Sequence, residues 1–333
     1  MSRFLFLYFL LFSFVSCSSK ESISPNISSN KKLFETEDFF ILSALRLEQI
    51  GDFRSAKELY TKLYDKTNRK EYLYKILQNK IYMGEFQSVL DRLELLLHEN
   101  KNDKKALKLQ TIALLSLAQI YSKEDNMDAI LVIYLKIYKI TQNIQIAEKI
   151  VQIYKYQQKY LELLAFLEIS HTNDKILLRL YIKFQRYREA YMLSYNIYLE
   201  ENDLNYLAQS AIFEYESAKD KDDKELLASV VKKLKDVIEG NKREPLYLNY
   251  LGYILIDHNI DITQGIKYVE DALKIEPKSA FYLDSLAWGY YKLGNCKDAQ
   301  KLMDDVLMLD DRDNEEVISH IEAIDRCLQK QRR

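Results

Sequence analysis

Residues 280–307 read AFYLDSLAWGYYKLGNCKDAQKLMDDVL, and this stretch decides the fold. Apolar and small residues recur every three or four positions on either side of Gly294, which is the spacing of amphipathic helices. Glycine readily adopts the left-handed conformation in which helices often end. Ala287 and Ala299 are small enough to let two helices approach closely. The stretch therefore predicts two antiparallel helices joined by a tight turn at Gly294.

The same pattern recurs along the chain. Gly84 and Phe86 follow Gly51 and Phe53 at the interval of a tetratricopeptide (TPR) repeat, roughly 34 residues. Residues 245–277 form a further unit. The pattern weakens in between, and the alternative is a non-repetitive helical domain. We nevertheless predict an all-α solenoid of about eight TPR-like helix hairpins.

A last helix is predicted from Asn314 to about Lys330, with charges on most of its faces. Terminal repeats need a polar outer surface, so this helix is interpreted as a cap. Gly289, which lies beside Trp288, has no packing role evident in the sequence.

The composition excludes several other classes of protein. The 333 residues include 7 Gly and 3 Pro, whereas average usage would give about 40 of the two together. Barrels, propellers and Gly-rich nucleotide-binding folds are therefore excluded. The net charge of −2 does not favour nucleic acid. The four histidines are scattered, and the sequence shows no metal-binding or nucleophile motif. We expect no enzyme activity, no metal and no cofactor.

The N-terminus, MSRFLFLYFLLFSFVSC, places Arg3 before an apolar run that is too short to span a membrane as a helix. Such a run is typical of a signal peptide. Its end, FVSC, resembles the lipobox of bacterial lipoproteins, although Phe14 stands where leucine is usual. The resemblance implies cleavage after residue 16, lipidation of Cys17 and, because Ser18 follows, an outer-membrane location. The alternative is an ordinary signal peptide that contains a cysteine.

Four segments are predicted along the chain. Residues 1–16 are the signal peptide, and 17–33 are the lipidated cysteine with a flexible Ser- and Asn-rich tether. Residues 34–240 hold degenerate repeats, and 241–333 hold two regular repeats and the capping helix.

Within 245–310, the sequences LYLNYLGYILIDHNID and IKYVEDALKIEPKSAFYLDSLAWGYYKLG resemble the C-terminal repeats of Gram-negative outer-membrane TPR lipoproteins. Members of that family are scaffolds in the envelope, and one delivers substrates to a periplasmic carboxyl-terminal processing protease. The resemblance implies a periplasm-facing scaffold or adaptor with a protein or peptide partner.

Helical-repeat solenoids bind ligands on a concave face, and in the TPR family the first helix of each pair lines it. Tryptophan and tyrosine are favoured anchors at such interfaces, and polar neighbours could bind a peptide backbone or terminus. Alternatively, Trp288 and Tyr253 pack between adjacent repeats. The predicted protein-binding residues are Asn249, Tyr253, Asp284, Trp288, Tyr291 and Lys292.

Cys296 and Cys327 are placed at the same end of two helices that should run antiparallel. An oxidising periplasm would allow a disulfide between them, which we predict as possible. The alternative is a pair of unbonded, partly buried thiols.

Three classes of function remain open. The favoured one is a protein-binding scaffold, and a pilotin-like assembly factor for a secretin, pilus or secretion system is its alternative within the class. An envelope enzyme would need a site that no motif reveals. A spacer between membrane and cell wall would have no specific protein partner.

Overall fold

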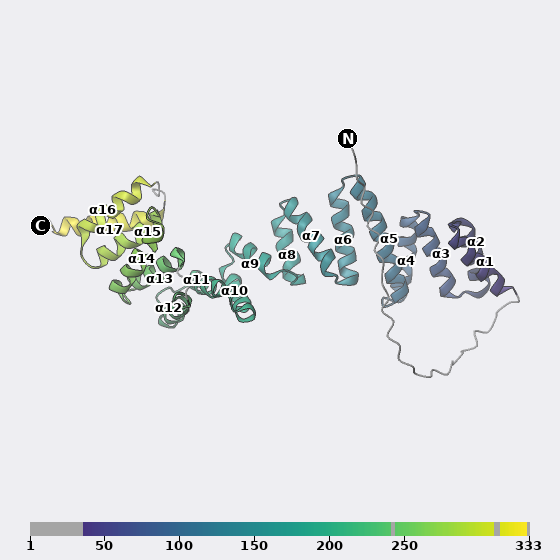
Figure 1. Ribbon diagram of the computed structural model, residues 1–333, viewed down its shortest axis with the longest axis horizontal. Coiled ribbons are helices and arrows are strands. Elements are labelled where there is room, and N and C mark those ends of the chain that lie inside the picture. The colour runs from purple at the N-terminus through teal and green to yellow at the C-terminus, as the bar shows by residue number, and fades with distance from the viewer. Residues whose placement is uncertain (1–35, 241–243, 310–313, 332–333) are drawn as a thin grey trace. The chain divides into compact units, whose positions relative to one another are not determined.

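The computed structural model describes residues 36–240, 244–309 and 314–331, and within these ranges every regular element is a helix. Helix follows helix with short connections throughout (Figure 1). The helices are α1 (Glu37–Gln49), α2 (Phe53–Thr67), α3 (Lys70–Tyr82), α4 (Phe86–Glu99), α5 (Lys104–Lys123), α6 (Met127–Thr141), α7 (Ile144–Tyr156), α8 (Tyr160–Ser170), α9 (Asp174–Lys183), α10 (Tyr187–Glu201), α11 (Leu204–Ser217), α12 (Lys224–Glu239), α13 (Pro245–Asp257), α14 (Ile262–Ile275), α15 (Ala280–Lys292), α16 (Cys296–Met308) and α17 (Glu315–Gln331).

Counted in chain order, the first sixteen helices form eight successive pairs, α1–α2 to α15–α16, and α17 follows the last pair. The predicted TPR-like architecture with a C-terminal helix is confirmed.

The turns explain how so few glycines suffice. Gly51, Gly84 and Gly294 adopt φ of +80° to +83° in the turns of the first, second and eighth hairpins, as expected from the sequence. In several other turns the left-handed position is held by Asn, Asp, His or Gln. Asn, Asp and His adopt this conformation more readily than other residues with a side chain. Within hairpins these residues are Asp125, Gln158, Gln185 and Asn259.

The chain divides into two compact units, Met1–Ile133 and Tyr134–Arg333, and the division falls within α6. In the first unit, α1 and α2 pack against α3 around Ala44, Ala56 and Leu63, all fully buried. In the second unit, an apolar cluster of buried residues lies around α13 and α14. The predicted boundary at 240/241 lies inside the second unit and remains a prediction.

Close helix packing in the second unit depends on glycine. A Cβ atom added to Gly265 would lie 2.7 Å from the Gly252 carbonyl oxygen, and one added to Gly252 would lie 2.7 Å from the Gly265 carbonyl oxygen. Gly289 also has a packing role, contrary to the sequence interpretation: an added Cβ would lie 2.7 Å from Ile266 Cγ1. The absent side chain lets α15 approach α14, which the sequence of one helix alone does not reveal.

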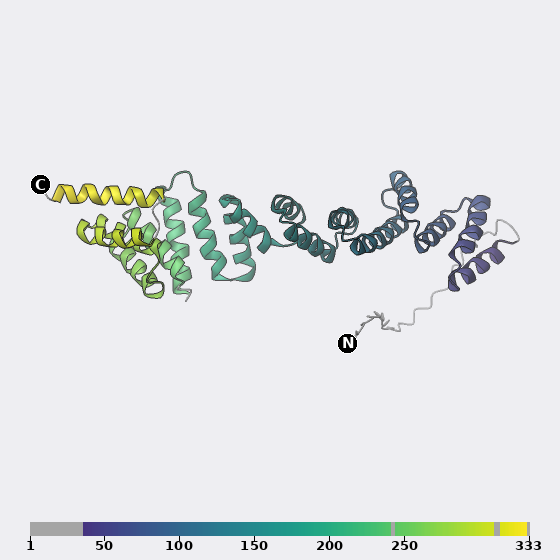
Figure 2. The same cartoon turned by 90° about the horizontal axis from the view of Figure 1, so that it is seen from above.

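Helix α17 packs along α15 and α16 through Val317, Ile324 and Leu328 (yellow in Figure 2). Cys327 of this helix is joined to Cys296 by a disulfide, with the two Cα atoms 6.1 Å apart. The predicted signal peptide and lipidated Cys17 lie outside the described residues. None of the helices in the described ranges is both long enough and apolar enough to cross a membrane.

Candidate functional site

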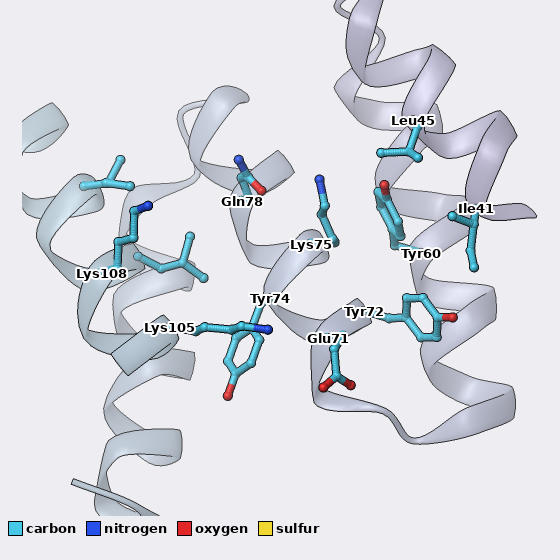
Figure 3. A pocket seen from close by; sticks show the side chains of 12 residues that line it. Ile41, Leu45, Tyr60, Glu71, Tyr72, Tyr74, Lys75, Gln78, Lys105 and Lys108 are labelled. Atoms are coloured by element: carbon cyan, nitrogen blue, oxygen red, sulfur yellow. The ribbon is translucent and has the colours of Figure 1, made fainter. Parts of the chain in front are cut away.

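The first helices of the first three hairpins, α1, α3 and α5, line an open groove of about 420 Å³, here called the lysine groove (Figure 3). Leu45 and Ile112 are each 39% exposed there, so the groove presents apolar surface to solvent. The lining residues are Ile41, Leu45, Tyr60, Glu71, Tyr72, Tyr74, Lys75, Gln78, Lys105, Lys108, Leu109 and Ile112.

Three lysines against one glutamate give the lining of the lysine groove a positive excess. Lys105 and Lys108 face Ile41 and Leu45 across it, with Lys75 between them (Figure 3). Lys75 forms an ion pair with Glu48 at 2.9 Å. Lys105 lies 5.7 Å from the centre of the Tyr74 ring, and Lys108 has no ion pair within the described residues. Two of the three cations are thus open to an acidic ligand.

The Tyr60 hydroxyl is an unpaired polar group in this groove. The side chain is only 2% exposed, and its oxygen forms no hydrogen bond within the described residues. Burial, together with the nearby Glu48 carboxylate, raises the pKa of Tyr60 well above its ordinary value, so the hydroxyl is protonated. A buried hydroxyl without a partner costs stability, which is a feature typical of ligand sites.

Two carboxylates fix the walls of the lysine groove. Asp103 caps α5 by accepting hydrogen bonds from the backbone of Lys105 and Ala106, and it also accepts one from the Tyr74 hydroxyl of α3. Burial opposes ionisation of Asp103, but these bonds hold its pKa below the ordinary value. Glu37 of α1 is buried and accepts from Tyr72 at 2.6 Å. Both bonds join first helices of neighbouring hairpins.

A second cavity lies at the corresponding place in the second unit, on the first helices α11, α13 and α15 of three successive hairpins. It has a volume of about 890 Å³ and is here called the acidic pocket. Six carboxylates and one lysine line it, together with four tyrosines. The carboxylates are Glu216, Asp222, Asp257, Glu276, Asp284 and Glu316.

Three of the six predicted protein-binding residues line the acidic pocket: Asn249, Tyr253 and Asp284. Asn249 is 9% exposed, and its Oδ1 atom is buried without a hydrogen-bond partner. Tyr253 donates its hydroxyl hydrogen to Glu316 of α17. Asp284 is buried and lies 2.9 Å from His320 Nδ1, also on α17. Helix α17 therefore forms one wall of the pocket.

The other three, Trp288, Tyr291 and Lys292, lie outside the pocket lining and contact each other. The Trp288 ring stacks on Tyr291 and on His320, with ring centres 4.7 and 4.0 Å apart. Its indole N–H donates to Asp257 Oδ1 at 2.9 Å, and Lys292 donates to the Asp257 backbone carbonyl at 2.8 Å. In this structure the tryptophan helps to hold α17 in place.

The sequence interpretation missed the lysine groove altogether. It looked for partner-facing residues only in the two most regular repeats. The predicted partner-facing residues lie on the first helix of a repeat, and Ile41 and Leu45 hold the equivalent positions on α1. A search that included the first hairpins would therefore have selected them. Lys105 and Lys108, one helical turn apart on α5, were the second signal.

Neither cavity has the side-chain grouping of a metal centre within the described residues. Comparisons with known proteins bear on the fold alone. No three His, Cys, Asp or Glu side chains in the described part of the chain are grouped as metal ligands. Neither a family model nor a curated protein matches this chain.

Solved TPR structures do match at low identity. The TPR protein TTC0263 of Thermus thermophilus is 16% identical over 64% of this chain and 98% of its own, with a TM-score of 0.38. A chain of the APC/C hetero-tetramer Cut9–Hcn1 is 12% identical over 90% of this chain and 57% of its own, with a TM-score of 0.42. The TPR2AB domain of yeast Sti1, solved as a complex with pHSP90, is 14% identical over 90% of this chain and 99% of its own, with a TM-score of 0.29. The sites are defined by this chain's own residues.

Proposed function

We propose that this chain is a protein-binding scaffold that captures an acidic, apolar segment of a partner protein in the lysine groove. The observation that carries the proposal is the groove itself, in which exposed Ile112 shares α5 with Lys105 and Lys108, and exposed Leu45 faces these lysines from α1. Apolar contacts would supply most of the affinity. The two lysines would set the orientation and select acidic side chains.

A fluorescein-labelled amphipathic peptide of leucine and glutamate tests this, with fluorescence anisotropy as the readout. The wild-type protein should bind it, and the double variant Lys105→Glu/Lys108→Glu should bind at least about tenfold more weakly. The matched control is Lys62→Glu/Lys101→Glu, which reverses two exposed charges outside the groove. Equal losses in both variants would show only the effect of net charge and would refute the proposal.

The scaffold is further proposed to be an outer-membrane lipoprotein that faces the periplasm. The lipobox-like FVSC sequence ending at Cys17 supports the anchor, and the likeness of residues 245–310 to envelope TPR lipoproteins supports an adaptor role, for example beside a periplasmic protease. Multiple acyl chains would anchor the chain firmly. An alkyne-labelled palmitate fed to cells should label the wild-type protein and leave Cys17→Ser unlabelled. A labelled Cys17→Ser variant would exclude this lipidation site.

A further inference from the structure

The acidic pocket combines an excess of negative charge with aromatic walls. Its lining carries six carboxylates against one lysine. Glu216 and Asp257 form ion pairs with Lys221 and Lys292, at 3.0 and 3.8 Å. Three of the six carboxylates, Glu216, Glu316 and Asp257, accept hydrogen bonds from the neutral donors Tyr250, Tyr253 and Trp288. Such bonds keep a carboxylate ionised and do not cancel its charge. The pocket therefore attracts cations.

The tyrosines report the same negative potential. Burial raises the pKa of Tyr250, and the Glu216 carboxylate raises it further. Burial also raises the pKa of Tyr253, with further contributions from Glu316 and Asp257. The pKa of Tyr282 rises to about 12 through burial and Glu276. The phenols therefore stay protonated, and the face of an aromatic ring attracts a cation.

The chain already shows how this pocket holds a cation. At its edge, Lys221 places its ammonium group 4.4 Å from the centre of the Tyr215 ring and 3.0 Å from Glu216 Oε2. This is one ion pair combined with one cation–π contact. The remaining volume holds further tyrosines and carboxylates with no second lysine among the lining residues.

Asn249 is an independent sign of a ligand site. It lies on the pocket wall in α13, and its Oδ1 atom is buried with no hydrogen-bond partner in the described residues. A buried acceptor without a donor is costly, and a ligand N–H group would satisfy it. The pocket volume of about 890 Å³ is within the usual range of ligand sites.

We infer that the acidic pocket binds a basic segment of a partner protein, with a lysine or arginine side chain entering between Tyr250, Tyr253 and the surrounding carboxylates. An arginine suits the site best, because its planar head can stack on an aromatic ring while donating several hydrogen bonds. The inference rests on the proposed function only in taking the ligand to be a protein segment. The binding site and the charge of the ligand are different from those of the lysine groove.

An arginine-rich, fluorescein-labelled peptide tests the inference on the disulfide-intact protein. The wild-type protein should bind it at least about tenfold more tightly than the matched peptide with glutamine in place of arginine. The double variant Glu216→Gln/Glu316→Gln should lose most of that preference. Glutamine can still accept the hydrogen bonds from Tyr250 and Tyr253, so folding should be preserved, and the wild-type comparison of the two peptides needs no variant.

The matched control is Glu200→Gln/Glu239→Gln, which removes two exposed carboxylates of the same unit outside the pocket. It should bind the arginine peptide like the wild type. Equal weakening in both double variants, equal binding of the two peptides by the wild type, or displacement by spermidine at the same concentration would overturn the inference. If the wild-type protein binds the leucine–glutamate peptide but not the arginine peptide, the inference about the acidic pocket is wrong. The proposal for the lysine groove would still stand.

Discussion

The lysine groove and the acidic pocket occupy similar positions in their repeats and differ in charge and in the helices that form their walls. Each is lined by the first helices of three successive hairpins, α1, α3 and α5 in one case and α11, α13 and α15 in the other. Repeat architecture places a concave surface at both positions. The residues on that surface, which the repeat leaves free to vary, decide what it can bind.

The wall supplied by α17 is the second difference. In the acidic pocket, this helix contributes Glu316 and is held through His320, Trp288 and the Cys296–Cys327 disulfide. The lysine groove is lined only by the hairpins themselves. The acidic pocket should therefore respond to changes in α17, and the lysine groove should not.

The largest expected effect separates the two sites through the disulfide. Cys327→Ala opens a loop defined by a sequence separation of 31 and should lower the free energy of unfolding of the second unit by about 3 kcal/mol. Hydrogen exchange measured by mass spectrometry should show faster exchange in α16 and α17. Arginine-peptide affinity should fall while leucine–glutamate-peptide affinity stays constant.

Treatment of the wild-type protein with reductant is the control and should reproduce both results. If reduction changed neither the exchange of α17 nor arginine-peptide affinity, α17 would not be a required wall of the acidic pocket.

A smaller effect is expected from helix packing beneath the acidic pocket. Gly265→Ala places a methyl group 2.7 Å from the Gly252 carbonyl oxygen, so α13 and α14 must separate, at a cost of about 2 kcal/mol. Gly84→Ala is the matched change in the first unit. A Cβ atom at position 84 would have no neighbour within 4 Å. Only the backbone strain at φ +82° would then lower the free energy of unfolding, by about 1 kcal/mol.

Thermal unfolding followed by calorimetry measures both glycine variants. Only Gly265→Ala should also weaken arginine-peptide binding, because α13 carries Asn249 and Tyr253. A larger loss of stability from Gly84→Ala would contradict this account of the packing.

The hairpin count could be predicted from the sequence because helical spacing survives even where the repeat signature fades. Helices α7 and α8 form a regular pair although their turn contains no glycine. Gln158 takes the left-handed position there at φ +55°, a role that composition does not reveal. Scarcity of glycine therefore did not mean scarcity of tight turns.

The sites were harder to predict because their character depends on residues brought together from separate hairpins. The sequence left open whether Trp288 binds a partner or packs between repeats, and it did not show that His320 of α17 stacks on this ring. Ile112 resembles a core residue in the sequence, and only the position of α5 shows that it lines an open groove.

The unpaired amide of the acidic pocket gives the next prediction. Asn249→Leu removes a buried acceptor that lacks a partner and replaces it with a side chain of similar size. Stability should stay constant or rise by up to about 1 kcal/mol, whereas arginine-peptide affinity should fall several-fold. Urea unfolding and anisotropy measure the two quantities on the same sample. Unchanged affinity would mean that the ligand does not reach Asn249.

The smallest effect is expected from the unpaired hydroxyl of the lysine groove. Tyr60→Phe keeps the buried ring and removes only the oxygen, so the free energy of unfolding should rise by up to about 1 kcal/mol. If the partner segment donates or accepts a hydrogen bond there, leucine–glutamate-peptide affinity falls about two- to tenfold, since one neutral hydrogen bond contributes about 0.5–1.5 kcal/mol. Arginine-peptide binding in the acidic pocket is the internal control and should not change. A loss of stability in Tyr60→Phe would show instead that Glu48 accepts the hydroxyl hydrogen in solution, and Tyr60 would then be a structural residue of the first unit and not a ligand contact.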